Sequence, residues 1–281
     1  MRYPLTIRHF GLLTLAFVAC GKNPQPETLF ETGPQVRSIT PAVDELSGLA
    51  SSVRYPGHLW GQEDSGNPAD LLLIREDGSY VRTVRLRGTV NRDWEDIARA
   101  GTDLYVADIG DNSAIYPDYR IFILPEPAPG VDTADVAQTI RYTYPDGPRD
   151  AEALLVDPVS RDLFVITKRD NPSRIYRIPS AGVSPVTAEF VGRFPFSGIT
   201  AATVSADGKE ILVRSYTRLF YFSRANGESI PQSLTRTPRE LTFQPEPQGE
   251  AVCFLPDGSG FITGSERAFG PAGQLFFYRR R

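Results

Sequence analysis

Short apolar strands separated by polar turns recur along the chain in five segments of one design. Each segment begins with a polar or acidic residue, continues into a small apolar strand and a turn, and gives a second strand that ends in charge. The segments start at residues 45, 94, 151, 199 and 249. When Gly48, Asp96, Ala153, Ala201 and Ala251 are taken as equivalent, the spacings are 48, 57, 48 and 50 residues. A period near fifty with strand-like content predicts β-propeller blades.

The remaining strands predict five blades of four strands each. Second strands fall at 59–64, 104–108, 163–168, 211–214 and 261–266, and third strands at 71–75, 119–124, 174–178, 219–222 and 274–278. Fourth strands follow at 80–86, 139–144, 189–194 and 240–243, so the fifth repeat lacks one. The unassigned strand at 35–40 would supply it and close an all-β ring without exposed sheet edges. The alternative is a six-bladed ring with a degenerate blade in residues 112–150.

The first 19 residues have the pattern of a lipoprotein signal peptide. Arg2 and Arg8 precede an apolar run that is too short to span a bilayer. The run ends in Phe17-Val18-Ala19-Cys20-Gly21, which resembles a bacterial lipobox, although Phe17 stands where leucine is usual. We expect acylation of Cys20, a tether over 20–33 and a single propeller domain over 34–281. Cleavage by an ordinary signal peptidase and a retained signal anchor are the alternatives.

These expectations place the protein on a membrane of the bacterial cell envelope, either the outer membrane or the cell surface. Two or three acyl chains would hold it there without a spanning helix. Loss of residues 1–19 would change the formal net charge from -4 to -6, because Arg2 and Arg8 are removed. An acidic domain whose one basic run is 279–281 is a poor candidate for nucleic acid. We expect a monomer that binds a small molecule or a protein.

Cysteine and histidine are too scarce for several kinds of chemistry. With Cys20 acylated, Cys253 is the one remaining thiol, and its apolar surroundings favour a buried hydrophobic residue. His58 is the one histidine of the mature chain, so a Cys/His zinc site lacks ligands. His58 also falls in a hairpin opposite the expected working face, which disfavours a Ser-His-Asp mechanism. Any metal would be a hard, oxygen-liganded ion such as Ca²⁺.

In a four-stranded blade, the first strand starts and the second strand ends on the same face. The starts provide Glu45 and Thr200 together with three acids that we take as metal-ligand candidates: Glu95, Glu152 and Glu250. The strand ends provide the ligand-binding candidates Asp64, Asp108, Asp111, Lys168, Arg169, Arg214, Tyr216 and Glu266, with Arg267 beside them. We therefore expect a charged channel mouth with an acidic arc from blades 1 and 2 and a basic arc from blades 3 and 4.

This mouth has two interpretations. Repeat-equivalent carboxylates can ring a calcium ion, which takes six to eight oxygens, and opposed acidic and basic arcs can hold a phosphate on a bound metal. Alternatively, the charges are inter-blade ion pairs that hold the ring together. For Trp94, a wedge between blades is favoured over a platform for a sugar.

Several motifs resemble uncharacterised secreted bacterial β-propeller proteins, the WD-like or phytase-like group. The motifs are Asp93-Trp94-Glu95-Asp96 and Asp108-Ile109-Gly110-Asp111-Asn112, with later signatures at 150–154, 167–169 and 249–252. The likeness covers most of residues 44–266. It implies a propeller but little about a reaction. Propeller phytases bind calcium through a ring of acids, a role that the resemblance assigns to Glu95, Glu152 and Glu250; the chain departs from that ring at Thr200.

The residues thus favour a non-catalytic propeller that binds a ligand or partner through its charged mouth. The main alternative is a calcium-dependent hydrolase of phosphoester or related ester substrates, with water attack near Lys168 and Arg214. Glycoside hydrolysis by a carboxylate pair needs only acids and stays open as a third reading.

Overall fold

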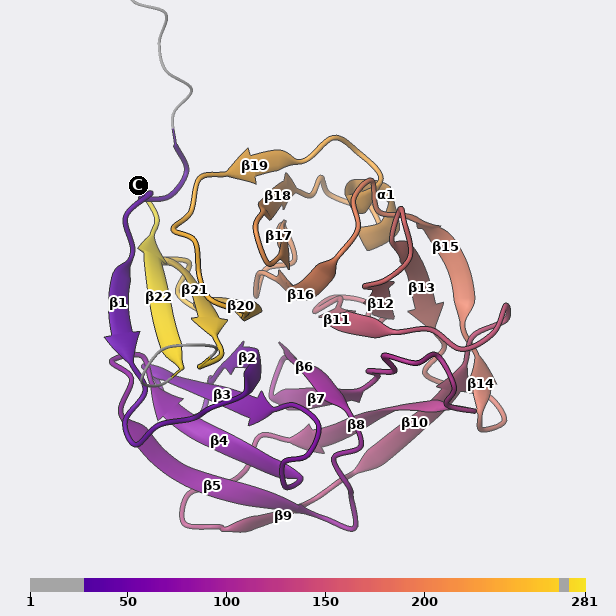
Figure 1. Cartoon of the computed structure of the whole chain (residues 1–281), viewed down its shortest axis with the longest axis horizontal. Helices are drawn as coiled ribbons and strands as arrows, with labels where there is room; N and C mark the ends of the chain where they lie inside the picture. Colours follow the sequence, from indigo (N-terminus) through magenta and orange to yellow (C-terminus); the bar gives the residue numbers. More distant parts are fainter. Residues whose placement is uncertain (1–27, 268–272) are drawn as a thin grey trace, which may run out of the picture.

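Five small β-sheets stand around a central axis and form a five-bladed β-propeller, as the repeat predicts (Figure 1). The computed structural model describes residues 28–267 and 273–281. The strand nearest the axis in each blade is, in order, β2 (Leu46–Ser51), β6 (Trp94–Ala100), β11 (Ala151–Val156), β16 (Ile199–Val204) and β20 (Gly249–Phe254). The six-bladed alternative is wrong, because residues 112–150 contribute to blades 1 and 2 and form no blade of their own.

Outside the innermost strand, each blade adds three more strands toward the rim. Blade 1 adds β3 (His58–Glu63), β4 (Asp70–Arg75) and β5 (Tyr80–Arg87). Blade 2 adds β7 (Asp103–Asp108), β8 (Tyr119–Pro125) and β10 (Gln138–Thr143). Blade 3 adds β12 (Leu163–Thr167), β13 (Arg174–Ile178) and β15 (Glu189–Arg193). Blade 4 adds β17 (Glu210–Ser215), β18 (Leu219–Ser223) and β19 (Arg239–Leu241). Blade 5 adds β21 (Gly260–Ser265), β22 (Gln274–Arg279) and β1 (Gln35–Ser38).

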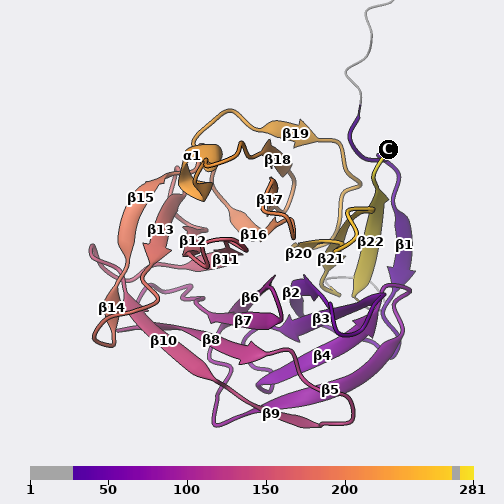
Figure 2. The ribbon, with the colours of Figure 1, turned by 180° about the vertical axis from the view of Figure 1, so that it is seen from behind.

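The ring closes where the start of the described chain meets its end, as predicted. β1 runs antiparallel to β22, with Val36 opposite Phe276, and supplies the fourth strand of blade 5. Upstream of β1, Phe30 forms a bridge with Arg280 and lies buried against Phe261 at a ring-centroid distance of 4.8 Å. Figure 2 shows β1 beside β22 from behind. Closure therefore uses both backbone pairing and an aromatic side chain.

Three short elements were not predicted, and two of them connect neighbouring blades. β9 (Thr133–Asp135), from the connection between β8 and β10 of blade 2, pairs in parallel with β5 of blade 1. β14 (Val186–Thr187), from blade 3, pairs in parallel with β10 of blade 2. The helix α1 (Ile230–Leu234) follows β18 and begins at the capping residue Ser229. The rims of blades 1 and 2 are thus covered by chain from the next blade.

The core consists of one apolar cluster at each of the five blade interfaces in the described chain. Side chains alternate between the two faces of a strand, so successive residues serve different clusters. On β4, Leu71 and Leu73 face blade 2, whereas Leu72 and Ile74 face blade 5. Both faces of most inner strands are buried, which explains their nearly continuous apolar sequences.

Every innermost strand has a β-bulge at the same place near its start. The residue inserted at each bulge is, in blade order, Ser47, Glu95, Glu152, Thr200 and Glu250. A bulge redirects a side chain and is common beside functional sites. Ser47, and not Glu45, is therefore the blade 1 counterpart of the three glutamates.

The innermost strands also touch one another closely. A Cβ atom on Gly48 would lie 2.7 Å from the backbone nitrogen of Ile97, so glycine is required where β2 meets β6. Asp96 is fully buried and accepts hydrogen bonds from the N–H groups of Ile97 (2.8 Å) and Leu154 (2.9 Å), which joins blade 2 to blade 3. These contacts set the spacing of the strands around the axis.

Three expectations about single residues are confirmed. Trp94 is fully buried between blades 1 and 2 and packs against Phe122. Cys253 is buried, and burial raises the pKa of its thiol to about 12. His58 opens β3 at the hairpin from β2, at the opposite end of the strand from Glu63.

Residues 1–27 lie outside the described part of the chain, and with them the expected signal peptide, Cys20 and most of the tether. Within residues 28–267 and 273–281, no helix is long and apolar enough to cross a membrane.

Candidate functional site

Three buried carboxylates meet at one mouth of the channel. One carboxylate oxygen from each of Glu95, Asp150 and Glu152 lies within 4.8 Å of the others. Glu95 and Glu152 are bulge residues of β6 and β11, and Asp150 directly precedes β11. We call these three residues the acid triad. Two of its members were predicted as metal ligands, whereas Asp150 was missed.

A glycine makes the room that Glu95 occupies. A Cβ atom on Gly110 would lie 2.1 Å from Glu95 Oε1 and 2.5 Å from Asp93 Oδ2. Any other residue at this position would displace both carboxylates. The Asp-Ile-Gly-Asp sequence at the end of β7 therefore has a physical role: it brings backbone without a side chain up to the acid triad.

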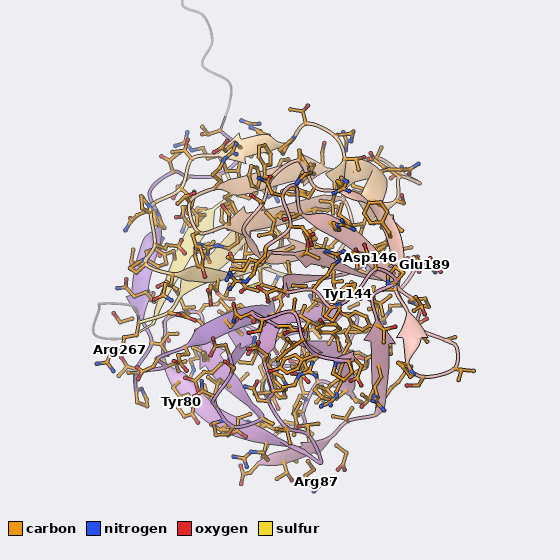
Figure 3. The ribbon with its side chains drawn as sticks, turned by 45° about the vertical axis from the view of Figure 1, so that its right-hand side comes forward. Tyr80, Arg87, Tyr144, Asp146, Glu189 and Arg267 are labelled. Carbon is orange, nitrogen blue, oxygen red and sulfur yellow. The ribbon has the colours of Figure 1, made fainter. Side chains whose placement is uncertain are left out.

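Asp150 is held by its neighbours on both oxygens. The N–H of Asp111 donates to Asp150 Oδ1 (2.9 Å), and Arg169 Nε donates to Oδ2 (2.7 Å). The loop that leads to Asp150 is fixed by Asp146, which accepts a hydrogen bond from Tyr176 (2.9 Å) and pairs with Arg149 (2.8 Å). Asp146, labelled in Figure 3, follows the end of β10 by three residues. The position of Asp150 is thus set by the fold.

A chain of polar contacts crosses the mouth from blade 3 to blade 5. Lys168 Nζ donates to Glu152 Oε1 and to Tyr216 Oη, the latter at 3.0 Å. Tyr216 Oη in turn donates to Glu250 Oε1. The second oxygen of Glu152, Oε2, is buried without a hydrogen-bond partner.

The acid triad is strongly self-repelling. Burial, followed by the charges of Glu152 and Asp93, holds the pKa of Glu95 well above its usual range. Burial raises the pKa of Glu152 to about 8; Glu250 and Asp150 add to the rise and Lys168 opposes it. Burial penalises the charged form, and each neighbouring carboxylate penalises it again. The site therefore favours the binding of a cation.

A second acidic group lies toward blades 1 and 5. Burial and the nearby Glu45 and Glu250 raise the pKa of Asp64 to about 7. Burial and a hydrogen bond with Glu250 raise the pKa of Glu266 to about 9. Both residues were predicted ligand-binding candidates, and both belong to the same negative field as the acid triad.

Three other candidates are buried and bound to neighbouring groups. Arg214 is fully buried and pairs with Glu246 at 2.9 Å. Asp108 is fully buried and accepts a hydrogen bond from the Asp93 N–H (2.9 Å). Asp111 accepts three hydrogen bonds, including one from Tyr119 Oη (2.9 Å). Arg214 and Asp108 fit the ion-pair interpretation, whereas hydrogen bonds alone hold Asp111. Lys168 and Arg169 thus form the basic arc in the described part of the mouth.

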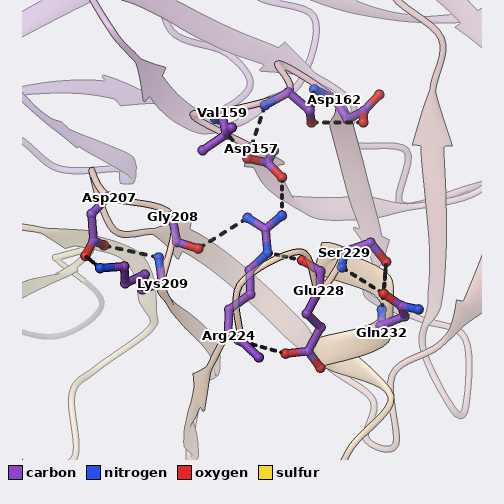
Figure 4. Close-up of polar contacts among 12 residues, drawn as sticks. Asp157, Val159, Asp162, Asp207, Gly208, Lys209, Arg224, Glu228, Ser229 and Gln232 are labelled. Atoms are coloured by element: carbon purple, nitrogen blue, oxygen red, sulfur yellow. Dashed lines mark hydrogen bonds and ion pairs between the residues drawn. The ribbon is translucent and has the colours of Figure 1, made fainter.

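A separate pocket of about 410 Å³ lies between blades 3 and 4, beside the hairpins that project from the opposite face (Figure 4). Arg224 stands in it and donates to Asp157 Oδ2 (2.6 Å), to the Gly208 carbonyl (3.2 Å) and to the Glu228 carbonyl. Asp207 and Lys209 face each other at its edge. These charges are paired with one another, and the pair between Arg224 and Asp157 joins blade 4 to blade 3.

Comparison with known proteins does not assign the chain to a family. No protein-family model matches the chain, and no curated protein is significantly similar to it. The resemblance to phytase-like propellers stays a prediction, and the propeller fold rests on the structure itself.

The raised carboxyl pKa values predict a stability that falls as pH rises. The folded chain holds a proton on Glu266 up to a pKa of about 9, whereas the unfolded chain releases it near 4.5. The stabilisation is complete below pH 4.5 and is lost as pH rises through the folded value. We expect the midpoint of thermal unfolding in EDTA to decrease between pH 5 and pH 9.

The variant Glu95→Gln tests the cause of this loss. The Gln amide removes one charge and donates to the neighbouring carboxylates, so it should stabilise the metal-free protein at pH 8 by about 1–2 kcal/mol. Chemical denaturation measures the effect, with the exposed Glu240→Gln as control. If Glu95 were instead a member of a structural ion pair, its replacement would destabilise the fold.

Proposed function

We propose that this protein is a non-catalytic binding propeller whose channel mouth takes a hard divalent cation, Ca²⁺, and through it a ligand or partner. The observation that carries the proposal is the acid triad, in which buried oxygens of Glu95, Asp150 and Glu152 lie within 4.8 Å of one another. The unpartnered Glu152 Oε2 supports it, because a buried carboxylate oxygen without a donor costs free energy that a cation would recover.

The donor set suits calcium better than a softer metal. It is made of carboxylate oxygens alone, which Ca²⁺ prefers, and contains no imidazole or thiolate. Three carboxylates supply three to six of the six to eight oxygens that calcium takes. The remaining positions would be open to water or to oxygens of a ligand. A cation held in this way would give the negative mouth an affinity for anionic or hydroxyl-bearing groups.

A calcium-dependent hydrolase is the second candidate. It is favoured by the position of Lys168 and Tyr216, whose ammonium and hydroxyl groups lie beside the acid triad and hydrogen-bond to each other at 3.0 Å. Turnover of a phosphoester, lactone or glycoside that requires calcium and disappears in Glu95→Gln would establish catalysis and replace the binding proposal.

Calcium titration tests the metal site. A ligand that binds only the folded state stabilises it by about 2.7 kcal/mol when its concentration is one hundred times Kd. For a domain of this size we expect millimolar CaCl₂ to raise the melting temperature by about 5 °C or more. Asp150→Asn and Glu152→Gln should abolish the rise, whereas Glu45→Gln, an acid at the mouth outside the triad, should keep it. Equal melting temperatures in calcium and EDTA would contradict the proposal.

We also propose that acylated Cys20 holds the propeller on a membrane of the bacterial cell envelope. The support is the sequence pattern over residues 1–21, followed by a polar tether with prolines. Metabolic labelling with a radioactive fatty acid should mark the wild type and not Cys20→Ser. Labelling that persists in this variant, or that is absent from both proteins, would exclude a Cys20 anchor.

A further inference from the structure

Lys168 contacts the acid triad from a more buried position than Arg169 does. Its ammonium contacts Glu152 Oε1, and its side chain is 15% exposed, compared with 57% for Arg169. We infer that Lys168 is a tethered counter-ion, which neutralises Glu152 while the site is empty and releases it when the divalent cation binds. This inference rests on the proposed calcium site. It makes Lys168 a residue that sets the affinity and selectivity of the site.

The backbone of Lys168 is fixed, so the side chain is the part that can move. The Lys168 N–H donates to the Asp150 carbonyl (3.0 Å), and its carbonyl accepts from the N–H of Gly198 (2.9 Å). These bonds come from Asp150 itself and from the connection to the next blade. Movement of the ammonium would therefore leave the position of Asp150 unchanged.

A place for the displaced ammonium already exists. Tyr216 Oη accepts from Lys168 Nζ at 3.0 Å, and the ammonium lies 5.0 Å from the centre of the Tyr216 ring. Tyr216 is hydrogen-bonded to Glu250, which brings a second carboxylate to the same side. The ammonium could give up Glu152 and keep both the hydroxyl group and the field of Glu250.

Competition follows from charge. A divalent ion bound to the triad would share Glu152 with the ammonium, and two positive groups at this distance repel strongly where water is scarce. A monovalent ion has the same charge as the Lys168 ammonium. The ammonium is covalently attached to the chain beside Glu152, so a free monovalent ion has no advantage over it. The occupied site should therefore discriminate against Na⁺ and K⁺ in favour of divalent ions.

Lysine also suits the role of a displaceable counter-ion better than arginine does. Three lysines stand against 27 arginines in the chain. The buried Arg214 shows what arginine does here: Nη1 contacts Glu246 and the carbonyls of Ala251 and Gly264 at once. A lysine ammonium is a compact charge on a flexible stem, so it exchanges partners more readily than a planar guanidinium.

Calcium affinity of Lys168→Met tests the inference. Methionine keeps most of the side-chain volume and removes the charge, so the variant should bind calcium at least about tenfold more tightly than the wild type. Lys209→Met removes the same charge from an exposed hairpin on the opposite face and should change the affinity less than twofold. Isothermal titration of all three proteins at one pH and ionic strength measures the difference.

A second variant moves the affinity in the other direction. Tyr216→Phe removes the hydroxyl that would receive the ammonium and leaves Lys168 on Glu152, so calcium should bind more weakly. This change keeps the ring and is mild for the fold. Weaker binding supports the inference, whereas unchanged or tighter binding in Tyr216→Phe contradicts it.

The results separate the inference from the proposed function. If the wild type binds calcium and Lys168→Met binds with equal or lower affinity, the counter-ion role is wrong and the metal site stands. If neither protein binds calcium, both proposals fail. If Lys168→Met alone binds measurably, the lysine controls access to the site, which supports the inference in its strongest form.

Discussion

The innermost strands hold several carboxylates close together at the mouth of the channel. The electrostatic properties of the mouth depend on this constraint. Each of these strands bulges at the same position, and in three blades the inserted residue is a glutamate. The strands β2 and β6 approach so closely that Gly48 leaves no space for a Cβ atom, and Gly110 after β7 leaves none beside the Glu95 carboxylate. Glu95 and Glu152 are therefore held close together, and with Asp150 they form a buried acidic cluster in which Lys168 pairs with Glu152 and Arg169 pairs with Asp150.

Two neighbouring buried acids of β6 have opposite surroundings. Asp96 is surrounded by backbone donors, including the N–H groups of Ile97 and Leu154, and it joins neighbouring blades. Glu95 lies on the same strand one residue earlier and meets mainly other carboxylates. The hydrogen bonds to Asp96 stabilise the ring. The repulsion between Glu95 and its neighbouring carboxylates destabilises the protein without a bound cation, so a cation bound there would relieve it. The five apolar clusters at the blade interfaces stabilise the fold enough to tolerate this cost.

Much of the architecture could be predicted from the sequence because each blade repeats the same strands and turns. The closure strand was also predictable, since a five-blade count left one strand without a partner. The β9 and β14 additions were not predictable, because strands of two or three residues have too little periodicity. The mouth was predicted only in part. Asp150 was missed because it precedes the strand. The burial of Arg214 against Glu246 was missed because a strand position does not reveal which blade interface a long side chain enters.

Anomalous diffraction from a crystal soaked in manganese(II), an oxygen-liganded stand-in for calcium, tests the central claim most directly. The account predicts one strong peak within about 2.6 Å of carboxylate oxygens from Glu95, Asp150 and Glu152. A mouth without a peak, or a peak bound by other residues while the acid triad stays empty, would contradict it.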